Sequence, residues 1–297
     1  MEQRSIEPKM TESEPLKLVY AEYAEHFEKS LRMGEYPLAV KLLERERDIP
    51  KLAKRPLRDW GYHLEVCQAM AISRRSGEMI ALMLEDMWCF EPVIGYGFTG
   101  GNKETFENAL KYFLDGNTRY PEAAKDWPTA RKWAHEFPRF EEAGKYVAIV
   151  TAPLMKACFE PDLVLLWINP VQLNQVLMGI TVQWGVDGVS CTLASHAGCV
   201  HYVVPPMKSK DFWVSNPCQG DIVFAAKEPS HLVFSAPLAK VEELLAGMEH
   251  IARYGWGLPT EYILKPETWL PDSYLTIAQM LGMYEESQPG NTISDTK

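Results

Sequence analysis

The fold is most constrained by short apolar runs that alternate with segments of helical periodicity along most of the chain. Two runs rich in β-branched residues, Tyr146–Thr151 and Asp162–Trp167, are the clearest predicted strands, and Leu38–Leu43 and Met79–Leu84 are similar to them. Apolar residues at helical spacing predict helices over Leu16–Arg32, Trp60–Ser73 and Lys103–Leu114. This alternation predicts an α/β (or α+β) protein with a mixed sheet flanked by helices.

A weak internal repeat is present in the second half of the chain. Leu163–Trp167 is followed by Asn169–Pro170 and an amphipathic segment, and Leu232–Phe234 is followed by Ala236–Pro237 and another such segment. Proline is favoured at the first helical position because its missing N–H has no partner there. The repeat suggests two pseudo-repeated α/β units, although two copies of so common a pattern also arise by chance.

The 297 residues suit a single domain with polar ends. We expect residues 1–14 to form a flexible tail, residues 15–285 a single α/β domain, and residues 286–297 a disordered tail, because the ends lack apolar periodicity. Residues 117–143 are rich in proline, tryptophan and charge, and we expect a helical or irregular insertion there.

Composition narrows the classes of partner. With 30 basic and 40 acidic residues, the chain has a net charge of −10, which opposes binding to nucleic acid and to anionic membranes. No stretch approaches the roughly 18 apolar residues of a membrane span, and Met1–Pro15 has no apolar signal segment. Six cysteines are too few for a disulfide scaffold, so we expect reduced thiols and a cytoplasmic location.

The motifs of several common enzyme classes, GxSxG, the Walker loop and HExxH, are missing. Gly95–Gly100 matches GxGxxG, but the segment before it contains Pro92 and is not a clean strand. A glycine-rich turn is therefore favoured over a dinucleotide site. Ser195 and His196 are adjacent in sequence, which alone does not make them a nucleophile and its base.

The cysteines are the most informative residues for function: Cys67, Cys89, Cys158, Cys191, Cys199 and Cys218. Several occupy predicted loop or helix-start positions, where backbone N–H groups lower the thiol pKa. Three or four thiolates from separate loops could hold zinc, copper(I) or an iron–sulfur cluster. Because no CxxC pair is present, cysteines that simply pack in the core are the alternative. His196, Cys199 and His201 form a local zinc candidate, against incidental polar residues at the edge of an element.

Several short motifs, taken in order, resemble the ArCR family of cysteine-containing prokaryotic proteins, also called domain of unknown function 169. The resemblance spans roughly residues 35–255 and rests on Pro37–Leu43, Cys67–Met70, Glu85–Cys89, Gly97–Phe98, Ala152–Leu154, Pro161–Val164, Ile168–Pro170, Cys191, Pro217–Asp221 and Phe234–Pro237. The insertion at 117–143 departs from the family's pattern. Asp221 stands where arginine is often expected, so a family anion site is not carried over to that position.

The resemblance implies that an iron–sulfur cluster, for example a 4Fe-4S cluster, is ligated by Cys67, Cys89, Cys191 and Cys218, with zinc as the alternative. We therefore expect a metal- or cluster-dependent lyase, hydrolase or oxidoreductase of anaerobic small-molecule metabolism. Its substrate could be aromatic, because tryptophans could line a pocket, although most of them are expected in the core. The alternatives are a metal or redox sensor with the same cysteines, and an accessory protein whose cysteines are structural.

Four residues are candidates for proton transfer at such a site: Lys41, His63, Glu85 and Asp86. His63 stands four residues before Cys67 on a predicted helix, hence on the same face. Lys41 interrupts a predicted strand, where it could be buried as a base or could simply face solvent. The sequence leaves the oligomeric state open, and a homo-oligomer is compatible with it.

Overall fold

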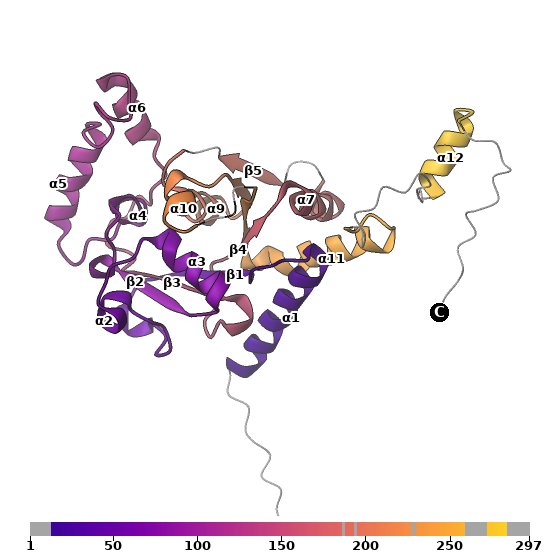
Figure 1. Ribbon diagram of the computed structural model, residues 1–297, viewed down its shortest axis with the longest axis horizontal. Helices are drawn as coiled ribbons and strands as arrows, with labels where there is room; N and C mark the ends of the chain where they lie inside the picture. Colours follow the sequence, from indigo (N-terminus) through magenta and orange to yellow (C-terminus); the bar gives the residue numbers. More distant parts are fainter. Residues whose placement is uncertain are drawn as a thin grey trace, which may run out of the picture.

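The computed structural model describes residues 13–185, 188–192, 195–226, 228, 230–258 and 272–283. At its centre is one seven-stranded sheet with the strand order β2-β3-β1-β4-β7-β6-β5 (Figure 1). The strands are β1 (Leu38–Leu43), β2 (Ile80–Met83), β3 (Ala148–Pro153), β4 (Leu163–Ile168), β5 (Val189–Thr192), β6 (Phe212–Ser215) and β7 (Leu232–Pro237). Neighbours are antiparallel except β5 and β6, which run parallel. The predicted α/β class with a mixed sheet is confirmed.

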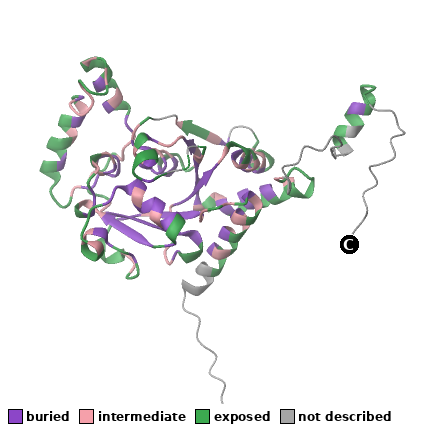
Figure 2. Ribbon diagram, in the orientation of Figure 1, coloured by how far each residue is buried: buried purple, intermediate pink, exposed green. Residues whose placement is uncertain are grey.

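Helices cover both faces of this sheet. One face carries α1 (Ser13–Leu31), α7 (Pro170–Trp184) and α11 (Val241–Arg253), and the other carries α3 (Val66–Ser76), α4 (Phe90–Tyr96), α8 (Gly198–His201) and α9 (Val204–Ser209). The remaining helices are α2 (Pro56–Trp60), α5 (Lys103–Leu114), α6 (Trp127–Glu136), α10 (Gln219–Val223) and α12 (Asp272–Met280), with 3₁₀ turns at Glu46–Asp48, Leu84–Asp86, Leu154–Lys156 and Leu238–Lys240. Figure 2 shows the central strands almost wholly buried between the two helical layers.

Burial on both faces explains why the central strands are continuous apolar runs. In β1, Leu38 and Val40 pack beneath α3, whereas Ala39 packs beneath the layer that contains α1. β3 and β4 are buried at every position. A strand enclosed in this way has no solvent face, so it needs no alternating polar residues.

One predicted helix is wrong in its extent. The segment expected as a single helix over Trp60–Ser73 forms α2 and α3, separated by residues 61–65. Gly61 ends α2 in the left-handed conformation with φ 76°, and Glu65 begins α3 through a capping box with Gln68. His63 lies in the intervening loop, so it does not share a helical face with Cys67.

The internal repeat of the structure differs from the predicted repeat of strand, proline and helix. Pro170 is the first residue of α7, as predicted, but Pro237 ends β7 and a 3₁₀ turn separates it from α11. A second likeness joins β3 to β7, because both strands end in Ala-Pro and continue into a Leu-x-Lys 3₁₀ turn. β1 and β4 are neighbours at the centre of the sheet, and β3 and β7 flank them. The two halves of the sheet therefore share a strand arrangement.

The predicted tails lie almost wholly outside the described residues. α1 begins at Ser13, and residues 1–12 and 284–297 are not described. Within the predicted insertion at 117–143, the structure has α6 at Trp127–Glu136. No helix among the described residues is both long and apolar enough to cross a membrane.

Candidate functional site

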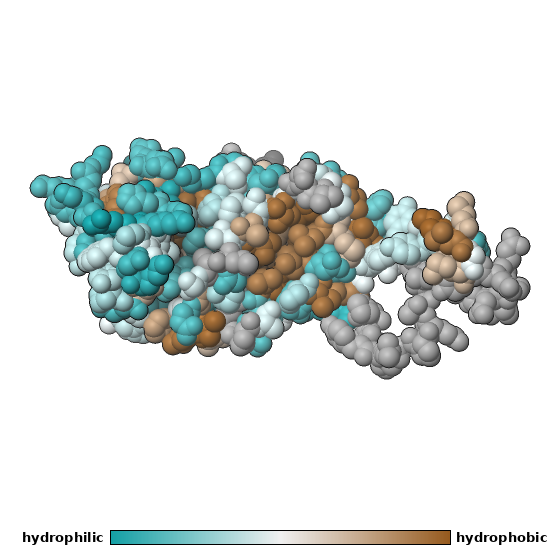
Figure 3. Space-filling view, turned by 90° about the horizontal axis from the view of Figure 1, so that it is seen from above, coloured by the Kyte–Doolittle hydropathy of each residue, from teal (hydrophilic) through white to brown (hydrophobic). Residues whose placement is uncertain are grey.

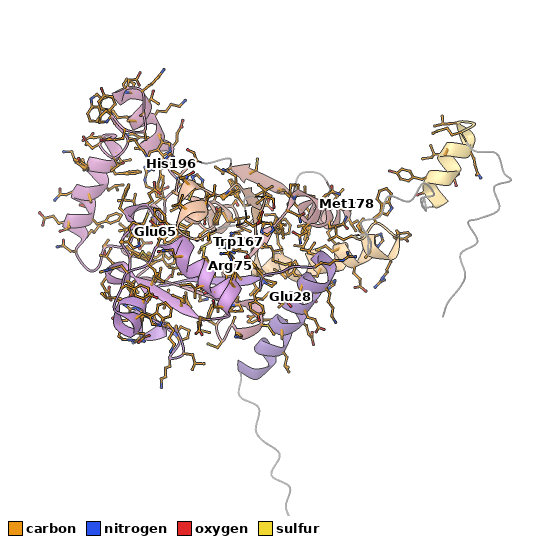
Figure 4. All side chains as sticks on the ribbon, viewed as in Figure 1. Glu28, Glu65, Arg75, Trp167, Met178 and His196 are labelled. Atoms are coloured by element: carbon orange, nitrogen blue, oxygen red, sulfur yellow. The ribbon has the colours of Figure 1, made fainter. Side chains whose placement is uncertain are left out.

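Four cysteines from separate parts of the chain line one cavity of about 140 Å³: Cys67, Cys89, Cys199 and Cys218. Three of them are almost fully buried, with 4% exposure for Cys67 and 6% for both Cys199 and Cys218. None forms a disulfide. Glu65 and His196, which also line the cavity, mark its position near α3 and α10 (Figure 4). Distant segments thus bring a set of soft sulfur ligands to one place.

Each of these cysteines stands at the start of a helix. Cys89 and Cys218 are the N-cap residues of α4 and α10, and Cys67 and Cys199 are the second residues of α3 and α8. Backbone N–H groups are unpaired in the first turn of a helix and stabilise negative charge there. The Cys218 sulfur accepts hydrogen bonds from the N–H groups of Gly198 and Asp221. The Cys89 sulfur likewise accepts the N–H of Glu91, so two of the four helix starts supply donors that suit a thiolate.

Two carboxylates accept hydrogen bonds from thiols that line the cavity. Cys67 Sγ donates to Glu65 Oε2 at 3.1 Å, and Cys218 Sγ donates to Asp221 Oδ2 at 3.4 Å. Asp221 is only 1% exposed and also accepts a hydrogen bond of 2.5 Å from Tyr202 Oη. These carboxylates can take up a thiol proton when the sulfur binds an electrophile.

A third carboxylate, Glu91, also lines the cavity and is paired with the Arg119 guanidinium. Burial nevertheless raises the pKa of Glu91, because removal from water disfavours its charged form more strongly than Arg119 stabilises it. Arg119 in turn lies over the Trp133 ring, with 4.1 Å between the guanidinium carbon and the ring centroid. The aromatic ring and the ion pair together fix this wall of the cavity.

Burial dominates the protonation of the four thiols. Removal from water raises the pKa of Cys89 and of Cys218 to about 12, although hydrogen bonds from backbone N–H groups oppose the shift. It raises the pKa of Cys67 and of Cys199 well above the ordinary thiol value. All four are therefore thiols near neutral pH in this conformation. A metal ion that binds them must displace protons.

The donor set fits a soft metal, whereas the present side-chain arrangement is not a finished coordination shell. Among the described residues, no group of three or more His, Cys, Asp or Glu side chains is placed to hold a metal ion. Cys67 and Cys218 instead direct their thiols toward carboxylates. Four cysteine sulfurs are, however, the ligands that zinc and iron–sulfur clusters use, and two of them, Cys89 and Cys218, already accept hydrogen bonds from backbone N–H groups.

A serine–histidine pair completes the cavity wall. Ser195 Oγ and His196 Nδ1 are 2.7 Å apart, and both residues line the cavity. Burial lowers the pKa of His196, and the nearby positive charge of Arg119 lowers it further. The imidazole is therefore neutral near pH 7 and can exchange a proton with the hydroxyl or with a bound group.

The structure brings together three of the four cysteines that the family resemblance implied as ligands. Cys67, Cys89 and Cys218 line the cavity, but Cys191 is exposed on β5 and does not. Cys199 occupies the fourth position. Cys158, whose role the sequence left open, packs beside the buried cluster formed by β1, β2 and β3.

The four residues predicted for proton transfer lie outside the cavity. Lys41 Nζ donates to the Glu160 carbonyl at 2.6 Å, and His63 is exposed in the loop before α3. Glu85 and Asp86 both bind Arg55, each at 2.5 Å.

Asp86 has a structural role in this arrangement. It is 1% exposed and accepts N–H groups from Met83 at 2.9 Å and Leu57 at 3.3 Å. These hydrogen bonds connect α2 to the end of β2. Together with the ion pair to Arg55, they give Asp86 a structural role.

Sequence reasoning missed two acidic residues of the cavity, Glu65 and Glu91. Glu65 stands two residues before Cys67 and Glu91 two residues after Cys89, so a search for acids beside cysteines would have found them. His196 and Cys199 were considered only as a local zinc group with His201. His201, however, does not line the cavity.

The fold and site define a helix-covered mixed-sheet protein with a four-cysteine cavity. The profile of the family described as uncharacterised ArCR, domain of unknown function 169, matches residues 26–247. The chain therefore belongs to the ArCR family. No curated protein and no solved structure matches the chain.

Proposed function

We propose that this protein binds an iron–sulfur cluster, or alternatively zinc, through Cys67, Cys89, Cys199 and Cys218. With this centre as its cofactor, the protein acts as an enzyme of anaerobic small-molecule metabolism. The convergence of these four cysteines on one cavity supports the proposal most strongly. Cysteines that serve only to fill the core are not expected to converge on one cavity from the starts of four helices. The proposed ligand set replaces Cys191 by Cys199.

The backbone N–H groups around the cavity suit a metal centre with negatively charged ligands. N–H groups at helix starts stabilise thiolates, and hydrogen bonds to sulfur tune the potential of a bound cluster. When bound, the metal or cluster supplies electron transfer or Lewis acidity. Glu65 is placed to accept the Cys67 proton, since the two side chains already share a hydrogen bond of 3.1 Å. His196 is the neutral base at the same wall.

The cavity is small for a substrate. Its volume of about 140 Å³ lies below the roughly 300–1,000 Å³ of typical small-molecule pockets. A substrate would therefore reach the centre from the side of Phe224, which lines the cavity and is 48% exposed. Phe224 contacts the exposed Trp88 ring edge-on, with 5.3 Å between centroids, so an aromatic or apolar substrate suits this entrance.

A metal or redox sensor is the second candidate, and the small cavity volume favours it. A sensor needs a closed set of ligands, whereas an enzyme needs an open coordination position. Cyanide or imidazole added to the metal-loaded protein distinguishes the two. A spectral change indicates an open position and supports the enzyme, and an unchanged spectrum supports the sensor. Six free cysteines among the described residues are compatible with a reducing, cytoplasmic location, which we also propose.

The proposal is tested by measuring iron, sulfide and zinc in protein purified without oxygen. We expect stoichiometric metal in the native protein and its loss in Cys199→Ser. Cys89→Ser is a second variant at a less buried position, in case Cys199→Ser does not fold. Cys191→Ser is the matched control, because Cys191 is exposed and lies outside the cavity. Metal-free native protein, or loss of metal from Cys191→Ser alone, would contradict the proposed site.

A further inference from the structure

Helix α7 combines a surface position with a sequence that has no charged residue. Its fifteen residues, Pro170–Trp184, are apolar or uncharged on every side. Yet Val171 is 54% exposed and Val182 is 40% exposed. A surface helix usually carries charged residues on the face that points away from the core. This helix therefore has a second face without a visible partner among the described residues.

The two faces of α7 are opposite one another. Leu173, Val176 and Ile180 are buried against the sheet. At 100° per residue, the opposite stripe consists of Val171, Gln175, Met178 and Val182, separated by four, three and four residues. This is the spacing of the contact positions in paired helices. Figure 3 shows an apolar band at the place of α7, and Met178 is labelled there in Figure 4.

Packing fixes the orientation of this stripe. α11 lies against the flank of α7, and the helices approach so closely that a Cβ on Gly179 would stand 2.9 Å from the Met248 nitrogen. Gly247 faces the Gly179 carbonyl in the same contact. Neither helix can rotate without a backbone collision. The outer stripe of α7 is therefore presented outward by the fold.

We propose that α7 is the interface between two copies of this chain, with the two α7 helices antiparallel across a two-fold axis. A second copy fits because neither α7 nor β5 carries a charged residue, so two chains with a net charge of −10 each can meet there without bringing like charges into contact. A two-fold contact also requires a surface complementary to itself. The stripe meets this condition, because the amide of Gln175 both donates and accepts hydrogen bonds and can pair with its own copy.

The adjoining sheet edge extends this surface. α7 is about 22 Å long at 1.5 Å per residue, which is short for the roughly 800 Å² per partner of a standard interface. β5 ends the sheet next to α7, since a Cβ on Gly188 would stand 2.8 Å from Ile180. At the opposite end, β2 is covered by a bridge to Lys54, whereas the described residues provide β5 with no neighbour besides β6. β5, with the sequence Val-Ser-Cys-Thr, is also uncharged.

Sedimentation equilibrium of the full-length protein, from about 1 to about 100 µM, tests the proposal. We expect a dimer in the native protein and at least tenfold weaker association in Val182→Glu, which buries an unpaired carboxylate opposite Val171 of the second copy. Gln175→Glu is the second variant, because it keeps the side-chain shape and is expected to weaken the dimer similarly. Leu52→Glu is the control, since Leu52 is exposed at 76% on a segment remote in sequence from α7.

The result that overturns the proposal is a native protein that remains monomeric throughout this range. A dimer that persists in both Val182→Glu and Gln175→Glu also overturns it, as does equal weakening by Leu52→Glu. Circular dichroism and thermal melting verify that each variant is folded. Because association is measured with and without bound metal, failure of this proposal is separable from failure of the proposed metal site.

Discussion

The Glu35 carboxylate neutralises an arginine that is almost completely buried. Arg74, on α3, is 1% exposed and lies over the Trp167 ring, with 4.7 Å from its guanidinium carbon to the ring centroid. Its charge is paired with Glu35, which also binds the partly exposed Arg75 at 2.6 Å. Removing one partner of a buried pair costs about 3–5 kcal/mol. Because the Glu35 side chain is 17% exposed, we expect Glu35→Gln to lower the free energy of unfolding by about 3 kcal/mol.

Urea unfolding at 25 °C, followed by tryptophan fluorescence, measures this change. Glu25→Gln is the control, because the Glu25–Lys29 pair is exposed at 63% and 75% and its loss should leave the stability nearly unchanged. The double variant Glu35→Gln/Arg74→Met removes the buried charge as well and should recover most of the loss. A loss below about 1 kcal/mol in Glu35→Gln would refute the assignment of Arg74 as a buried charge that depends on Glu35.

Two further predictions concern the cavity wall and its protons. Gly198→Ala should destabilise the protein and weaken metal binding, because a Cβ there would collide with Asp221 and stand 2.5 Å from Tyr202 Oη. Unaltered melting temperature and metal content in this variant would contradict the close packing. Zinc affinity, measured by chelator competition, should rise with pH between 6.5 and 8. Burial holds the pKa of Cys89 and of Cys218 at about 12, so binding releases protons throughout this range, with about tenfold gain per pH unit for each proton displaced. A pH-independent affinity would show that these thiols are not ligands.

The central fold could be predicted because its strands carry an unambiguous signal. β1 and α5 have the expected bounds, Leu38–Leu43 and Lys103–Leu114. The runs that form β3 and β4 are apolar throughout, since both faces of these strands are covered. β5 and β6 were not predicted. Each has only four residues, and β5 contains serine, cysteine and threonine in partly exposed positions, so it has neither alternation nor a continuous apolar run.

The site could be predicted only in part, because it depends on long-range contacts. Cys67, Cys89 and Cys218 were singled out, but Cys191 and Cys199 are eight residues apart and the sequence does not say which faces inward. The fold decides it. Cys191 lies on the exposed terminal strand β5, whereas Cys199 is carried beneath α4 and α3 by the short helix α8. Likewise, Gly61 interrupts the expected long helix and removes His63 from the site.

The most direct test of the central claim is X-ray absorption at the metal edge of protein loaded with zinc or reconstituted with iron and sulfide. The proposed site predicts a metal coordinated mainly by sulfur, with zinc–sulfur distances of about 2.3 Å and four sulfur ligands per zinc ion. Cys199→Ser should replace one sulfur by a lighter ligand or release the metal, and Cys191→Ser should leave the spectrum unchanged. A first shell made only of nitrogen and oxygen, or a sulfur shell that persists when Cys67, Cys89, Cys199 and Cys218 are replaced one by one, would contradict the account.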